Sequence, residues 1–245
     1  MDSGNIGFVL LCAAFVFVMT PGLAMFYGGL VRKKNVVNTM MTSIFIIGIG
    51  IVMWVLFGYS LSFAPSGNAF IGDFRWLGLE GVSLTEGYTD GASIPNMVFS
   101  AFQMMFAVIT PALITGAVAG RMKFKSIFVF TIFWSLIVYY PLAHMVWGQG
   151  GLLGADGIGA LDFAGGDVVH ISSGVSALVL CILLGKRHDY EHSIYRIHNI
   201  PTVVLGASLL MFGWFGFNAG SALAADGLAA HAFMTTGVSA AAAML

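Results

Sequence analysis

The chain contains a series of apolar runs that are each long enough to cross a lipid bilayer. A spanning helix needs about 20 mostly apolar residues, and only 9% of the 245 residues are charged. The candidate spans are residues 6–30, 41–63, 95–119, 126–147, 163–185, 200–222 and 228–245. Only helices and closed barrels satisfy the backbone in lipid, and the alternating strands of a barrel are absent. The sequence therefore predicts an all-α membrane protein with about seven spans.

The charged residues between these runs fall into two sets. Nine of the ten Lys and Arg residues follow the first, third and fifth runs, whereas the other connections carry mainly Asp and Glu, with Arg75 as the exception. Basic short loops remain in the cytoplasm. We therefore expect a multi-pass protein of the cell membrane whose N-terminus lies outside.

Several function classes and site types find little support. No broad basic surface is present, which argues against binding nucleic acid. Cys12 and Cys181 each lie inside an apolar run, so we expect packing residues, without a disulfide framework or a cysteine zinc site. The seventh run reaches Leu245 with no basic residue after it. We expect residues 1–245 to be the N-terminal part of one longer membrane domain.

Polar and aromatic residues occur at regular depths inside the spans. Ionisable residues within a span usually face a cavity or a partner, and His170 lies about 12 Å below the outer helix end, from a rise of about 1.5 Å per residue. Trp214, Phe217 and Ser221 are spaced i, i+3, i+7, which places them on one helix face. We expect Ser221 at the outer mouth, Phe217 one turn below and Trp214 level with His170. Plain packing and a route inward both explain this arrangement.

Two further aromatic residues, Phe106 and Trp147, are candidates for binding a cation. Trp147 ends the fourth run, where a tryptophan is ordinarily an interfacial anchor. An aromatic face also attracts a small cation, by about 0.5–1 kcal/mol when exposed and about 2 kcal/mol or more when desolvated. Together with the Ser221 hydroxyl, these rings would suit a compact cation that donates hydrogen bonds.

Four segments resemble the Amt/Mep/Rh ammonium transporter family, and more narrowly its prokaryotic Amt branch. They are FYGGLVR at 26–32, AHMVWG at 143–148, LDFAGGDVVH at 161–170 and GWFGFNAGS at 213–221. The resemblance implies an Amt-like bundle of eleven helices with a five-plus-five inverted repeat, assembled as a homotrimer with one pore per subunit. It also implies a transporter without cofactor or metal, and not an enzyme.

Carried over by position, the resemblance also assigns roles to residues. Phe106, Trp147 and Ser221 match the external ammonium site, and Phe106 and Phe217 match the gate. His170 matches the first of two pore histidines, the second lying in the family's other half. The pore-lining aromatic is Trp214, and Asp162 is the acid that organises the vestibule.

The implied mechanism is recruitment of ammonium, its deprotonation, and conduction of ammonia through a hydrophobic pore. Methylammonium is the analogue substrate. The family also implies a PII-type signalling protein on the cytoplasmic face, for which the loop 186–199 is a plausible contact and a solvated loop is an equal alternative.

Two residues depart from expectation. Gly120 stands where the family commonly has Glu, which puts packing at the inner mouth in question, and His231 has no assigned role.

Three other functions compete with transport. The first is an ammonium sensor or transceptor coupled to a signalling module, and the second is an unrelated channel for a neutral solute or gas. The third is an intramembrane metalloenzyme that uses His144, His170 and Asp162. No HExxH-type spacing supports that third possibility.

Overall fold

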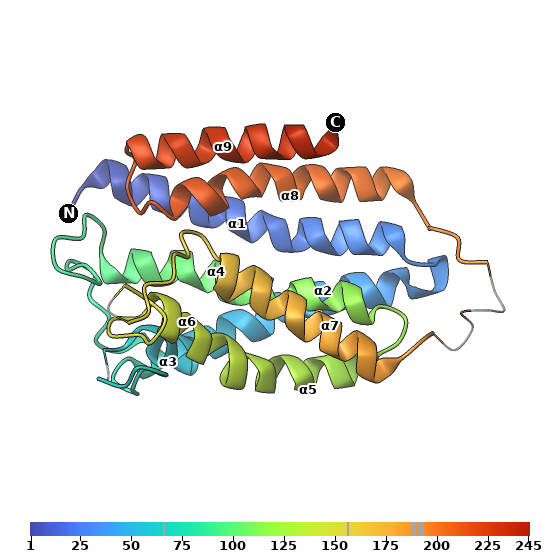
Figure 1. The fold of residues 1–245 in the computed structure, drawn as a ribbon, viewed down its shortest axis with the longest axis horizontal. Coiled ribbons are helices and arrows are strands. Elements are labelled where there is room, and N and C mark those ends of the chain that lie inside the picture. Colours follow the sequence, from blue (N-terminus) through green and yellow to red (C-terminus); the bar gives the residue numbers. More distant parts are fainter. Residues whose placement is uncertain (66, 156, 188–189, 191–193) are drawn as a thin grey trace.

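The computed structural model describes residues 1–65, 67–155, 157–187, 190 and 194–245, and no strand occurs among them. The long helices run roughly side by side (Figure 1). The α-helices are α1 Ser3–Leu30, α2 Val36–Met53, α3 Tyr59–Phe63, α4 Asn96–Val118, α5 Phe124–Trp134, α6 Tyr140–Trp147, α7 Ser172–Leu184, α8 Ile200–Gly220 and α9 Gly227–Met244. Short 3-10 and π-helical turns join or extend them: η1 Lys33–Asn35, η2 Trp54–Gly58, η3 Leu77–Leu79, η4 Ser135–Tyr139 and η5 Gly166–Ile171.

Six helical segments within the described residues are long and apolar enough to cross a membrane. They are Ser3–Leu30, Lys33–Phe63, Asn96–Val118, Phe124–Trp147, Gly166–Leu184 and Ile200–Gly220. The predicted all-α membrane class is confirmed. The seventh predicted run also forms a helix, α9, but this helix is not one of the six. Its many Ala, Gly and Thr residues, together with His231, make it less apolar than the others.

The connections gather at two opposite ends of the bundle (Figure 1). We call the end that holds the N-terminus and residues 64–65, 67–95, 148–155, 157–165 and 221–226 the acidic end. Hydrogen bonds join these segments there, from Asp2 N to Ser93 O at 2.8 Å and from Ala225 N to Asn5 Oδ1 at 2.9 Å. The segments 31–35, 119–123, 185–187 and 194–199 lie at the other end, which we call the basic end. Charge thus divides along the bundle axis as the sequence predicts.

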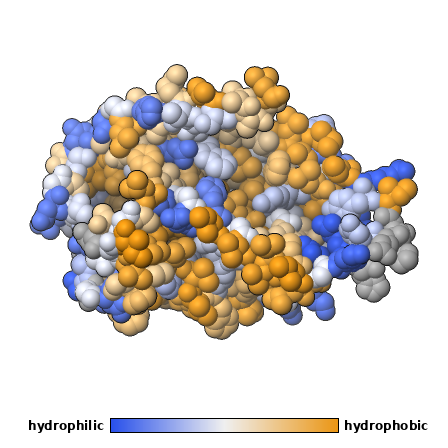
Figure 2. Space-filling model, in the orientation of Figure 1, coloured by the Kyte–Doolittle hydropathy of each residue, from blue (hydrophilic) through white to orange (hydrophobic). Residues whose placement is uncertain are grey.

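Polar residues on the surface also gather toward the two ends of the bundle, as the charged connections do. Figure 2 shows apolar side chains over much of the middle of one face, with hydrophilic residues mostly toward the two ends. Apolar residues of α7 such as Val175, Leu178 and Ile182 are exposed. An apolar belt between polar ends is the arrangement that a bilayer requires.

Glycines bring α8 against its neighbours and thereby place the end of α8. A Cβ on Gly206 would lie 2.3 Å from the backbone nitrogen of Phe26 in α1. Near the acidic end, a Cβ on Gly220 would lie 2.8 Å from Cε2 of Phe102 in α4. Small residues allow this close helix approach in membranes. Ser221, which follows Gly220, is therefore held beside α4.

The backbone conformation and close packing at the basic end explain why position 120 is a glycine. Its φ is +72° and a Cβ there would lie 2.8 Å from Asn35 Nδ2, so a glutamate would be strained as well as crowded. The next residue, Arg121, donates to Gly185 O at 2.9 Å and also to Ala117 O. Packing at this end is thus built around the glycine. Of the predicted regulatory loop, residues 188–189 and 191–193 lie outside the described residues.

Candidate functional site: an aromatic pocket above a closed ring pair

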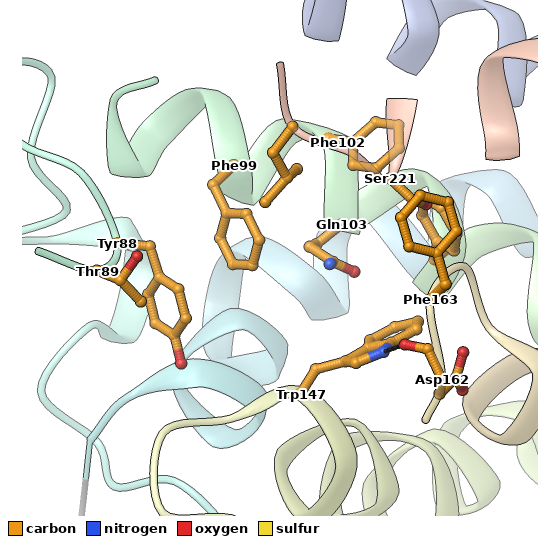
Figure 3. A pocket seen from close by; sticks show the side chains of 11 residues that line it. Tyr88, Thr89, Phe99, Phe102, Gln103, Trp147, Asp162, Phe163 and Ser221 are labelled. Atoms are coloured by element: carbon orange, nitrogen blue, oxygen red, sulfur yellow. Dashed lines mark hydrogen bonds between the residues drawn. The ribbon is translucent and has the colours of Figure 1, made fainter. Parts of the chain in front are cut away.

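A pocket of about 250 Å³ lies at the acidic end, and we call it the aromatic pocket. It brings together four of the predicted site residues, one of which is Phe106 of α4. The other three are Trp147 at the end of α6, Asp162 and Ser221, which Figure 3 labels. The complete lining is Tyr88, Thr89, Phe99, Phe102, Gln103, Phe106, Trp147, Asp162, Phe163, Ser221 and Leu223. Segments distant in the sequence therefore form one predominantly aromatic chamber.

Asp162 is held entirely by backbone donors. Both carboxylate oxygens accept hydrogen bonds at the N-terminus of η5, where unpaired N–H groups favour a negative charge. The four donors are the N–H groups of Gly165 at 2.5 Å, Gly166 at 2.9 Å, Asp167 at 2.8 Å and Val168 at 3.0 Å. The carboxylate thus organises the segment 162–168 and keeps a fixed negative charge beside the pocket.

The same segment orients Trp147. Its indole Nε1 donates to the backbone oxygen of Asp162 at 2.9 Å. The Trp147 ring meets Phe106 edge to face, with centroids 5.9 Å apart and planes at 88°. Because the indole N–H is already hydrogen-bonded to the backbone, Trp147 presents only its π-surface to the pocket.

The Ser221 hydroxyl can act only as an acceptor toward the pocket, because its proton is bonded to the preceding turn of α8. The hydroxyl donates to Phe217 O at 2.9 Å. A serine hydroxyl has one proton and two lone pairs, so the lone pairs of Ser221 remain for a donor in the pocket.

Two buried phenylalanine rings pack against each other at the inner side of the pocket. Phe106 and Phe217 are 1% and 2% exposed, and their ring centroids lie only 4.4 Å apart at 41°. We call them the ring pair. They come from α4 and α8, the two helices that Gly220 brings together.

His170 and Trp214 lie on the inner side of the ring pair. Their rings are stacked, with centroids 5.4 Å apart and planes at 9°. Phe217 lies 6.0 Å from the His170 ring and 5.9 Å from Trp214. The structure therefore places Trp214 level with His170, as the helical spacing predicts. Within the described part of the chain, the exposed imidazole of His170 has no hydrogen-bond partner, so both ring nitrogens remain available.

The structure separates His144 from the other two residues of the metalloenzyme hypothesis. His144 is fully buried, with Nδ1 3.1 Å from Ser62 O and Nε2 2.8 Å from Asn68 O. It holds the start of the long acidic-end connection. No cluster of three or more His, Cys, Asp or Glu side chains placed to hold a metal occurs among the described residues. His231 lies on the exposed face of α9, away from the pocket lining.

Several pocket residues were not predicted. Phe99 lies seven residues before Phe106, so helical spacing on α4 could have indicated it. Tyr88 and Thr89 come from the long connection before α4, where no periodicity places them. Burial raises the pKa of Tyr88 to about 12. The phenol of Tyr88 is therefore uncharged and forms part of the pocket wall. Its oxygen accepts a hydrogen bond from Gln149 N at 3.1 Å.

Known proteins resemble this chain over nearly its whole length. The sequence model of the Ammonium Transporter Family matches residues 7–245. An ammonium transporter of Bacillus subtilis is 53% identical over 99% of this chain and 58% of its own length. Saccharomyces cerevisiae Mep2 superposes with a TM-score of 0.82 at 38% identity, over 92% of this chain and 50% of that one. A structure described as a sensor Amt protein matches with a TM-score of 0.81 at 29% identity, over 93% of this chain and 56% of that one.

The relatives named as transporters are not enzymes. The chain spans between half and three fifths of the length of the proteins compared. The match covers almost all of this chain at high identity. The chain belongs to the ammonium transporter family.

Proposed function

We propose that the chain supplies the external binding site and the first part of the pore of an ammonium transporter. Ammonium binds in the aromatic pocket, gives a proton to water on the outer side of the ring pair, and passes inward as ammonia beside His170. The observation that carries this proposal is the unbroken succession of rings from Trp147 through Phe106 and Phe217 to His170.

The aromatic pocket suits a small cation that carries N–H donors. Trp147 and Phe106 supply π-surface, which attracts a desolvated cation by about 2 kcal/mol or more. Ser221 offers lone pairs, and the fixed charge of Asp162 lies beside the pocket. Ammonium can use both kinds of contact, since it is positively charged and donates four hydrogen bonds.

The ring pair favours a neutral species beyond the pocket. Rings 4.4 Å apart leave no space for a hydrated ion, and moving a charge into the bilayer interior costs several kcal/mol. Ammonia avoids most of that cost, whereas potassium cannot lose a proton. A neutral imidazole both donates and accepts hydrogen bonds, so His170 replaces part of the water that ammonia leaves behind.

The wider setting follows from the family and from the charge pattern. The protein lies in the cell membrane as a homotrimer, with the acidic end and the N-terminus outside. The basic end faces the cytoplasm, where a PII-type protein docks near residues 186–199. The positive-inside rule supports this orientation.

Uptake of labelled methylammonium tests the proposal. Cells that express the protein from its complete reading frame should take up methylammonium, and ammonium should inhibit that uptake. Uptake that ammonium does not inhibit would instead favour a channel for an unrelated solute. Trp147→Leu and His170→Ala uptake indistinguishable from wild type would refute the site assignments.

A sensing role is the second candidate, and the match to the sensor Amt structure favours considering it. A sensor binds ammonium without needing a large flux. Binding of methylammonium to purified protein, combined with no flux in proteoliposomes, would favour sensing over transport.

A further inference from the structure

Gln103 is a buried polar residue in the aromatic pocket that the proposed mechanism does not use. It lies one turn before Phe106 on α4, and its side chain is only 8% exposed. Figure 3 shows its amide end pointing into the space that Phe99, Trp147 and Ser221 surround. It is therefore part of the same chamber as the predicted binding residues.

The amide oxygen of Gln103 is buried without a hydrogen-bond partner among the described residues. A buried acceptor without a donor is destabilising, and native proteins rarely leave one unless a ligand or water completes it. The unused acceptor is the second observation that points to a ligand.

The neighbouring polar groups cannot supply the missing donor. The Trp147 N–H is bonded to the backbone of Asp162, and the Ser221 hydroxyl proton is bonded to the backbone of Phe217. Asp162 contributes only acceptor oxygens, and these already hold four backbone donors. These three groups therefore offer the pocket acceptors and no free donor.

We propose that the amide oxygen of Gln103 is a second hydrogen-bond acceptor for the cation, acting together with Ser221. This inference rests on the proposed function, and it defines the site further. Two oxygen acceptors would take two of the four N–H donors of ammonium, while the rings of Phe106 and Trp147 contact the rest of the ion.

Gln103→Met tests this role, because methionine keeps the length of the side chain and removes the acceptor. Loss of one hydrogen bond to the cation should raise the apparent KM for methylammonium about ten-fold, which corresponds to about 1.4 kcal/mol. The maximal rate should change less than KM. Asn38→Leu is the control, since Asn38 is exposed near the basic end and does not line the aromatic pocket; its KM should equal that of wild type.

Two further variants separate binding from a purely structural role. Gln103→Glu keeps the shape and the acceptor, so its KM should not rise. Gln103→Asn withdraws the amide by one methylene, so its KM should rise even if the methionine variant accumulates poorly in the membrane. Equal losses in the methionine and glutamate variants would mean that the amide only packs, and would overturn the proposal.

The outcomes also distinguish this inference from the proposed function. If wild-type uptake responds to ammonium and Trp147→Leu weakens it, but Gln103→Met leaves KM unchanged, only the role of Gln103 is wrong. Absence of ammonium-sensitive uptake and binding in the wild type would refute the proposed function and this inference with it.

Discussion

Replacing Asp162 should destabilise the fold and impair transport together, because its carboxylate acts through the backbone. A helix cap with one hydrogen bond contributes about 1 kcal/mol, and a hydrogen bond to a charged group contributes about 1.5–3 kcal/mol. Asp162 accepts four such bonds but is only half-buried, so water replaces part of the loss. We expect Asp162→Ala to lower the free energy of unfolding by about 2–4 kcal/mol.

Thermal unfolding of the purified protein, read beside methylammonium uptake, measures both effects. A loss of that size should lower Tm by about 5–10 °C. Asp226→Ala is the matched control, since Asp226 caps α9 through one bond, to Ala229 N at 2.9 Å, and should cost about 1 kcal/mol. The reasoning is refuted if Asp162→Asn abolishes uptake while Tm stays at the wild-type value, because that result would make the carboxylate a proton acceptor.

Three other substitutions give distinct expectations. Trp147→Leu removes the π-surface and should raise the apparent KM for methylammonium about 5- to 30-fold, from a loss of about 1–2 kcal/mol; an unchanged KM would argue against cation recognition by this ring. His170→Ala should lower the maximal rate of uptake while binding at the aromatic pocket, measured by titration calorimetry, stays near wild type. Gly206→Ala should lower Tm, because its new Cβ would lie 2.3 Å from the Phe26 backbone, whereas Gly48→Ala, with nothing within 4 Å, should not. Equal effects of the two alanines would contradict the packing analysis.

Features set by local spacing or by the membrane could be predicted from the sequence. A span must be long and apolar, so the six spanning segments follow from composition. The face shared by Trp214, Phe217 and Ser221 follows from helical geometry alone. The structure adds the geometry of the rings that this face meets, with Phe217 4.4 Å from Phe106 and Trp214 5.4 Å from His170 between ring centroids.

Features that depend on long-range contacts could not be predicted from the residues alone. The four backbone bonds to Asp162 depend on the π-helical turn η5 and on Gly165, whose φ is +112°. Tyr88 reaches the pocket because the connection 64–95 folds back over the acidic end, and nothing in its residue pattern fixes that path. The resemblance to a known family supplied the role of Asp162, but the geometry that explains the role comes from the fold.

Phe106 contacts Trp147 on one side and Phe217 on the other. In the proposed function, one aromatic side chain would therefore be shared by the chamber that captures the ion and by the barrier beneath it. Any rotation of Phe106 that widens the barrier also alters the chamber wall, so tight capture and fast inward release oppose each other. Substitutions at this position should trade affinity against turnover, and no single side chain there should improve both.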